Sequence, residues 1–190
     1  MKVLKFGGTS VANAQNILLV EKIVKKESSE NRVVVVVSAL SGVTDGLISA
    51  AELASTKNEK YTETIKSLEE KHLEFVKNLL PITEQSSWLS FVKKNFNDIE
   101  DICNGIYVLG EFTPRIKDKI TAYGEFLSSN IIAAKLKSDG LDCVWLDSRN
   151  YIKTNSNFTD AKVNFETTNA ALQTYFKENK QQITLAPGFI

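Results

Sequence analysis

The hydrophobic positions of the first forty residues alternate between strand-like and helix-like spacing. The run Val3–Phe6 ends at Gly7-Gly8, and apolar residues then recur at helical spacing from Val11 to Lys26. Five consecutive valines at 33–37 follow without polar alternation, as expected of a strand buried on both faces of a parallel sheet. The opening therefore predicts a strand–helix–strand unit with helices covering the sheet.

The middle of the chain has helical spacing almost throughout. We expect the first helix of this region, 44–55, to be capped at its start by Thr44 or by a neighbouring small polar residue. The later ones are amphipathic and carry no recognisable chemistry. The predicted helices are 44–55, 61–80, 84–109 and 114–137, with Pro81 joining the second and third and Asp139-Gly140 ending the fourth.

The last fifty residues return to an α/β pattern. The spacing predicts strands at 141–146 and 182–186, a short strand at 151–154 and a helix at 162–177. The chain then ends in a turn, Pro187-Gly188-Phe189-Ile190, where a complete α/β layer would supply a covering helix. We therefore expect an α/β protein whose sequence is cut off within a motif.

Charge and composition narrow the classes of partner. The 190 residues contain 23 basic and 23 acidic side chains, so bulk electrostatics do not favour nucleic acid or an anionic membrane as a partner. The first residues are too short an apolar run for a signal peptide, and no apolar stretch approaches the roughly 18 residues of a membrane span. A cytoplasmic protein is the default expectation.

The two cysteines and the one histidine offer little chemistry. Cys103 and Cys143 lie among apolar neighbours without the spacing of a zinc site, which indicates reduced core thiols. His72 lies in a predicted amphipathic helix, and we interpret it as a surface histidine or one with its hydrogen bonds satisfied. No metal ligands are predicted from the residues.

The strongest candidate site follows the first strand. Lys5 ends that strand, and the glycines Gly7 and Gly8 would let backbone N–H groups approach an anion. A helix N-terminus directly after the loop would add positive potential to that of the lysine. The segment has neither GxGxxG nor the Walker pattern, so a phosphate cradle and a plain turn with Thr9 and Ser10 as caps both remain open.

Two further segments could complete a pocket. Ser38 and Thr44 follow the five-valine strand, and their hydroxyls would face the first loop if the two strands are adjacent. Glu125 follows Gly124 in an otherwise apolar helix, where its carboxylate is either a partly buried member of an ion pair or a receiver for a ligand's ammonium group. The pattern alone favours the structural role for Glu125.

Several motifs resemble those of aspartate kinases in the amino acid kinase superfamily. They are Lys5-Phe6-Gly7-Gly8-Thr9-Ser10-Val11-Ala12, Val36-Val37-Ser38-Ala39, Gly42-Val43-Thr44, Gly124-Glu125 and Gly188-Phe189-Ile190. The resemblance spans nearly the whole chain and is least informative at 57–117. The opening through Ala14 is most similar to the kinase part of bifunctional aspartate kinase/homoserine dehydrogenases.

The resemblance implies a fold and a set of roles. The fold is a three-layer α/β/α sandwich around a mainly parallel sheet, and the reaction transfers the γ-phosphoryl group of ATP, with Mg²⁺, to the side-chain carboxylate of L-aspartate. Lys5 would touch the transferring phosphoryl group, while Gly7, Gly8, Thr9 and Ser10 line the phosphate side. Ser38 and Thr44 would contact aspartate, and Glu125 would receive its α-ammonium group.

The resemblance also indicates what the 190 residues lack. Aspartate kinases continue into a glycine-arginine and serine-aspartate motif, a nucleotide-binding half and regulatory domains, so residues 1–190 would be the N-terminal, substrate-binding portion. We expect this portion to have little or no activity alone. The alternatives are another amino acid kinase, for glutamate or acetylglutamate, or a non-catalytic fragment that binds aspartate. An unpaired sheet edge further predicts a homo-oligomer.

Overall fold

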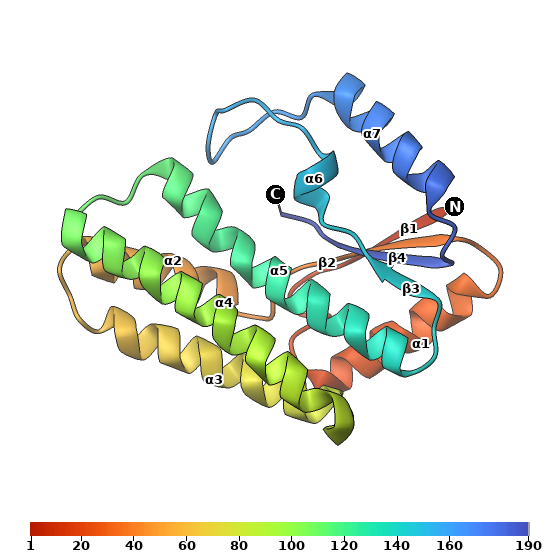
Figure 1. Cartoon of the computed structure of the whole chain (residues 1–190), viewed down its shortest axis with the longest axis horizontal. Coiled ribbons are helices and arrows are strands. Elements are labelled where there is room, and N and C mark those ends of the chain that lie inside the picture. Colours follow the sequence, from red (N-terminus) through yellow and green to blue (C-terminus); the bar gives the residue numbers. More distant parts are fainter. Residues whose placement is uncertain (190) are drawn as a thin grey trace.

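The computed structural model describes residues 1–189, which form one parallel sheet between layers of helices (Figure 1). The strand order is β1-β2-β4-β3, and every pairing within it is parallel. The five valines form β2, which is hydrogen-bonded on both sides, as their unbroken apolar run predicts. The strands are β1 (Lys2–Phe6), β2 (Val33–Val37), β3 (Cys143–Trp145) and β4 (Ile183–Pro187).

Two crossover helices lie on opposite faces of the sheet. Helix α1 (Ala14–Ser28) connects β1 to β2, and α7 (Phe165–Glu178) connects β3 to β4 from the other edge. Parallel crossovers are right-handed, so two connections that progress in opposite directions across the sheet place their helices on opposite faces. The α/β/α sandwich expected from the sequence is confirmed.

The remaining long helices form a layer on the α1 side of the sheet. Their contacts run from α2 to α3, α3 to α4 and α4 to α5, and α5 packs directly on the strands. The main hydrophobic core lies between these helices and the sheet, whereas a smaller cluster around Tyr175 lies under α7. The helices are α2 (Val43–Ser55), α3 (Tyr61–Leu79), α4 (Ile82–Leu109) and α5 (Pro114–Ser138).

Two helix starts differ from the prediction. Helix α1 begins at Ala14 rather than Val11, because Asn13 is its cap and accepts a hydrogen bond from Asn16 N–H at 2.9 Å. The N-terminus of α1 therefore does not directly follow the Gly7-Gly8 turn, because residues 9–13 lie between them. Helix α2 is not capped by Thr44: it starts after Gly42, whose φ of 75° lies in the left-handed region, and no side chain caps it.

The prediction of a strand at 151–154 is wrong for all of these residues except Thr154. Tyr151 ends the short helix α6 (Ser148–Tyr151), and Thr154 makes only an isolated antiparallel bridge with Val163. This bridge closes a hairpin over residues 153–164, and α7 accordingly begins at Phe165, three residues after the predicted start. These residues therefore lead into a hairpin rather than forming a strand of the sheet.

His72 is buried, so its interpretation as a surface residue is wrong. Its Nδ1 lies 2.7 Å from Leu68 O and its ring contacts that of Phe96, while Nε2 has no partner within residues 1–189. Burial lowers the pKa of His72 to about 4. Cys103 and Cys143 are buried free thiols, as expected, and burial raises the pKa of each to about 12.

Candidate functional site

The carboxyl ends of β1 and β2 bring the first two candidate segments together. We define the first loop as residues 7–13 and the second loop as residues 38–42. Ser38 N–H donates to Phe6 O at 3.0 Å, and a Cβ at Gly8 would lie 3.6 Å from Ala39 O. The adjacency of strands that the sequence predicted therefore places the two loops side by side.

The first loop is exposed at Gly7, Thr9 and Asn13 and is held mainly by its own backbone. Ser10 and Val11 N–H groups both donate to Gly7 O, and Thr9 O accepts from the Asn16 side chain at 2.7 Å. Lys5 is exposed on β1, and no ion pair involves it within residues 1–189. Because Asn13 caps α1, the hydroxyls of Thr9 and Ser10 do not have the capping role that was the alternative to a phosphate cradle.

The second loop is held from outside by α5 and α3. Ser128 of α5 is buried, and its Oγ–H donates to Ser38 O at 2.8 Å. Lys71 of α3 donates to Ser41 O. Ser128 was not among the candidates from the sequence, although a pair of serines on an apolar helix face is a signal that could have indicated a buried polar contact.

Gly124 allows α5 to approach the second loop closely. A Cβ at this position would lie 3.0 Å from Ala39 Cβ and 3.4 Å from Val43 Cγ1, tighter than ordinary contact. The glycine of the Gly124-Glu125 pair therefore has a packing role, and it sets the next residue, Glu125, beside the carboxyl ends of the strands.

Glu125 binds the backbone of the turn after β4. Its Oε2 accepts hydrogen bonds from Gly188 N–H at 2.6 Å and Phe189 N–H at 2.5 Å. Such short bonds from two donors to one carboxylate oxygen are charge-assisted and strong. No ion pair involves Glu125 in the part of the chain that the structure describes, so the ion-pair alternative from the sequence has no partner there. The expected family turn also includes Ile190, which lies outside the described residues.

A second serine holds the end of β4. Ser148 is buried and donates to Pro187 O at 2.8 Å, one residue before the turn that Glu125 binds. Beside it, Arg149 pairs with Asp147 at 2.7 Å and lies over the Phe126 ring, 4.7 Å from its centroid. The hydrogen bond from Arg149 lowers the pKa of Asp147.

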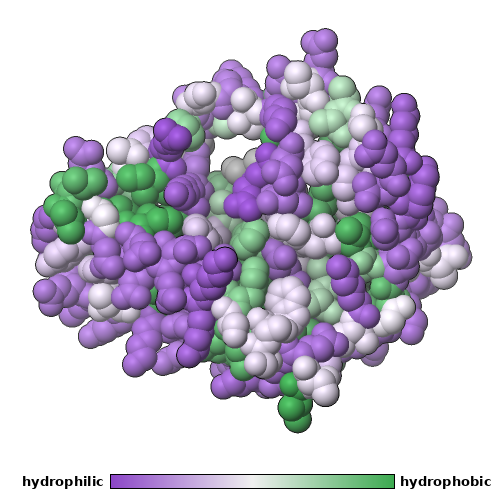
Figure 2. All heavy atoms as spheres, viewed as in Figure 1, coloured by the Kyte–Doolittle hydropathy of each residue, from purple (hydrophilic) through white to green (hydrophobic). Residues whose placement is uncertain are grey.

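The hairpin at 153–164 encloses a cavity next to this turn. The cavity measures about 320 Å³, and Figure 2 shows the opening between the hairpin and the body of the molecule. Thr159 at the hairpin tip donates its N–H to Asp118 Oδ2 of α5 at 2.8 Å. The lining residues are Asp118, Thr154, Thr159, Asp160, Ala161, Val163, Gly188 and Phe189.

The candidate residues fit an anion and an amino acid better than a caged metal ion. Within residues 1–189 no cluster of three or more His, Cys, Asp or Glu side chains could hold a metal. Lys5 and the Gly7-Gly8 turn suit a phosphate, and Mg²⁺ is commonly held by phosphates and water with few protein carboxylates. No helix in the same range is long and apolar enough to cross a membrane.

Comparison with known sequences gives consistent matches. The family model described as the amino acid kinase family matches residues 1–190. The chain is 35% identical over 191 residues to the chloroplastic bifunctional aspartokinase/homoserine dehydrogenase 1 of Arabidopsis thaliana, covering 99% of this chain and 21% of that protein. It is 31% identical to the bifunctional aspartokinase/homoserine dehydrogenase of Buchnera aphidicola, covering 100% of this chain and 24% of that protein.

Solved structures with the same fold include aspartokinase III of Escherichia coli in complex with aspartate and ADP. It superimposes with a TM-score of 0.86 at 23% identity, covering 100% of this chain and 41% of that one. The same enzyme with lysine and aspartate gives a TM-score of 0.87 at 24% identity. At these identities the likeness shows the fold, and the chain spans about a fifth to a quarter of the bifunctional relatives' length.

Proposed function

Because the chain belongs to the amino acid kinase family, we propose that it is the aspartate-binding portion of an aspartate kinase. The observation that carries the proposal is the meeting of three segments at one edge of the sheet: the second loop, Glu125 and the turn after β4. They come from distant parts of the sequence, and the second loop and Glu125 carry groups that suit aspartate. The relatives that match almost the whole chain are aspartokinases, which favours aspartate over glutamate or acetylglutamate.

The amino acid would be held by complementary charge and hydrogen bonds. Glu125 Oε2 is occupied by two backbone N–H groups, which leaves Oε1 to receive the α-ammonium group of aspartate. Ser38 and Thr44 would donate to its carboxylates, and within residues 1–189 neither side chain makes a hydrogen bond that would compete.

The phosphoryl group would be received beside the first loop. Lys5 supplies a full positive charge there, and the N–H groups of Gly7, Gly8 and Thr9 supply the dipoles that a phosphate needs, while Ser10, whose N–H donates to Gly7 O, would offer its hydroxyl. Mg²⁺, held with ATP, would neutralise further phosphate charge. Catalysis would come from positioning and charge neutralisation, because the aspartate carboxylate is itself the nucleophile and attacks the γ-phosphorus in line with the departing ADP oxygen.

Calorimetric titration of this chain with L-aspartate tests the proposal. We expect saturable binding of L-aspartate, weaker binding of L-glutamate, and loss of binding in Glu125→Ala. The loss of a charged hydrogen-bond partner should cost about 1.5–3 kcal/mol, or about 10- to 100-fold in Kd. Equal affinity for the two amino acids, or binding that Glu125→Ala leaves intact, would contradict the proposal.

A phosphoryl-transfer assay on the same chain should give little or no turnover. By the resemblance, residues 1–190 would supply only the substrate-binding portion of a site whose nucleotide-binding half lies elsewhere in the family's domain. We also expect self-association, because β1 is an edge strand in the described chain and exposes Met1 and Val3.

A further inference from the structure

One side of helix α5 binds the backbone of three separate segments around the candidate site. The three polar side chains on this side that bind other segments are spaced seven and then three residues apart along the helix. We call them the polar stripe. The contacts are Asp118 Oδ2 with Thr159 N–H at 2.8 Å, Glu125 Oε2 with Gly188 and Phe189 N–H at 2.6 and 2.5 Å, and Ser128 Oγ–H with Ser38 O at 2.8 Å.

Ser128 has the strongest link to the substrate side. It is fully buried, and a buried hydroxyl is tolerated only where hydrogen bonds replace the water it has lost. Its partner is the carbonyl of Ser38, the residue whose side chain we assign to aspartate. With Gly124 in contact with Ala39, this hydrogen bond fixes the distance between α5 and the second loop, and with it the distance from Ser38 to Glu125.

Asp118 performs a similar task for the hairpin. Thr159 has φ of 68°, a left-handed conformation that is costly for a β-branched residue, by about 1–3 kcal/mol. Its N–H group points to Asp118, so the carboxylate stabilises a backbone shape that the sequence of the hairpin does not favour. The two residues lie in the wall of the same cavity as Gly188 and Phe189.

We propose that the polar stripe sets the relative positions of the second loop, the hairpin and the turn after β4. In this scheme Ser128 and Asp118 are positioning residues that act on aspartate binding without touching aspartate. The inference rests on the proposed function and deepens it, because it explains how segments from four parts of the chain form one amino acid site.

The matched pair Ser128→Ala and Ser129→Ala tests the first contact. Ser129 is also fully buried on α5, but its hydroxyl accepts from Trp145 Nε1–H at 2.9 Å, away from the second loop. We expect Ser128→Ala to raise the calorimetric Kd for L-aspartate about five- to tenfold, the size of one hydrogen bond. Ser129→Ala should lower stability by a similar amount and leave that Kd unchanged.

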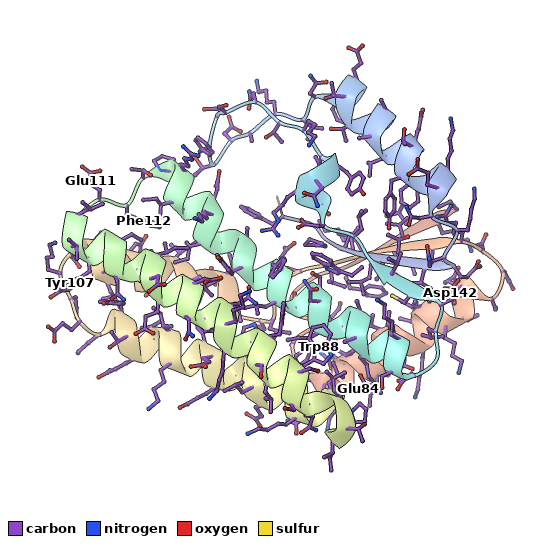
Figure 3. All side chains as sticks on the ribbon, viewed as in Figure 1. Glu84, Trp88, Tyr107, Glu111, Phe112 and Asp142 are labelled. Carbon is purple, nitrogen blue, oxygen red and sulfur yellow. The ribbon has the colours of Figure 1, made fainter. Side chains whose placement is uncertain are left out.

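The pair Asp118→Ala and Asp142→Ala tests the second contact. Asp142 lies near the amino ends of the strands (Figure 3), where its Oδ2 accepts Gln182 N–H at 2.9 Å, so it matches Asp118 in chemistry but not in place. We expect Asp118→Ala to raise the Kd for L-aspartate about two- to fivefold and to speed amide exchange at Thr159. Asp142→Ala should leave both unchanged.

Amide hydrogen exchange separates this inference from the proposed function. If the unchanged chain does not bind L-aspartate, the proposed function fails, and exchange still decides the positioning role. Faster exchange at 38–42 in Ser128→Ala than in Ser129→Ala supports that role. The same exchange at 38–42 and the same Kd for L-aspartate in these two variants would overturn it.

Discussion

The first and second loops follow neighbouring parallel strands, yet they are held in different ways. The first loop is stabilised by bonds among its own residues and with the adjacent turn of α1. The second loop is bound by Ser128 from α5 and Lys71 from α3, and Gly124 packs against it. A phosphate can be met by backbone N–H groups that adjust to it, whereas an amino acid with three charged groups needs partners at fixed distances.

The largest expected effect concerns α3, the helix whose Lys71 binds the second loop. We expect acid to lower the stability of the folded chain through His72 on this helix. His72 lies next to Lys71 on α3, and burial lowers its pKa from an ordinary value near 6.5 to about 4. The folded state therefore favours the neutral ring, while the unfolded chain takes up a proton near pH 6.5. Stability from His72 is complete above that pH and is lost as the pH falls from 6.5 towards 4.

By linkage, the loss should reach about 3 kcal/mol. Urea unfolding of the wild type and of His72→Phe at pH 7 and pH 4 measures it. The variant should lack this part of the acid destabilisation, because phenylalanine does not titrate. A difference between the two proteins that is the same at both pH values would contradict the assignment.

Removing the charge beside the first loop should affect phosphate binding alone. We expect Lys5→Met to weaken binding of inorganic tripolyphosphate about 10- to 100-fold, as loss of a charge-assisted contact does. The Kd for L-aspartate should change little, and because Lys5 is exposed the free energy of unfolding should change by less than about 0.5 kcal/mol. Calorimetry with each ligand measures the contrast, and an equal loss for both would show that the two sides are not separate.

A pair of glycine substitutions compares the packing of the two loops. At Gly124 a larger side chain must displace Ala39 and Val43, so Gly124→Val should lower the free energy of unfolding by about 1–3 kcal/mol. At Gly7 a Cβ would meet no atom within 4 Å, so Gly7→Ala should be neutral within about 0.5 kcal/mol. Thermal unfolding compares them, and a greater loss at Gly7 would reverse our view of the two loops.

The first and second loops also differ in how much of each could be predicted from the sequence. The first loop is local, so Lys5 and the two glycines could be proposed as a candidate anion site from the six consecutive residues Lys5–Ser10. Its helix start was misplaced because Thr9, Ser10 and Asn13 are all good caps, and only the three-dimensional turn selects Asn13.

The residues that bind the second loop and Glu125 could not be predicted from local sequence patterns. The Ser38–Ser128 and Glu125–Gly188 contacts join residues 90 and 63 positions apart, and no spacing rule connects them. The start of the hairpin was mistaken for a strand because four residues are too few to tell the two apart, and only the pairing of Thr154 with Val163 distinguishes them. The fold class survived these errors because the buried valine strand and the alternation of strands with helices depend on many residues at once.

The strand order has a consequence for how the chain is made. Of the four described strands, β4 leaves the ribosome last, yet it lies between β2 and β3, and its Ile183 pairs with Val33. Until that moment the valine strand has one open side, and the nascent chain must keep a strongly apolar edge from pairing with another molecule. Completion of the sheet is therefore an insertion of β4 between two strands made before it, and it is the step at which a chaperone would have most to protect.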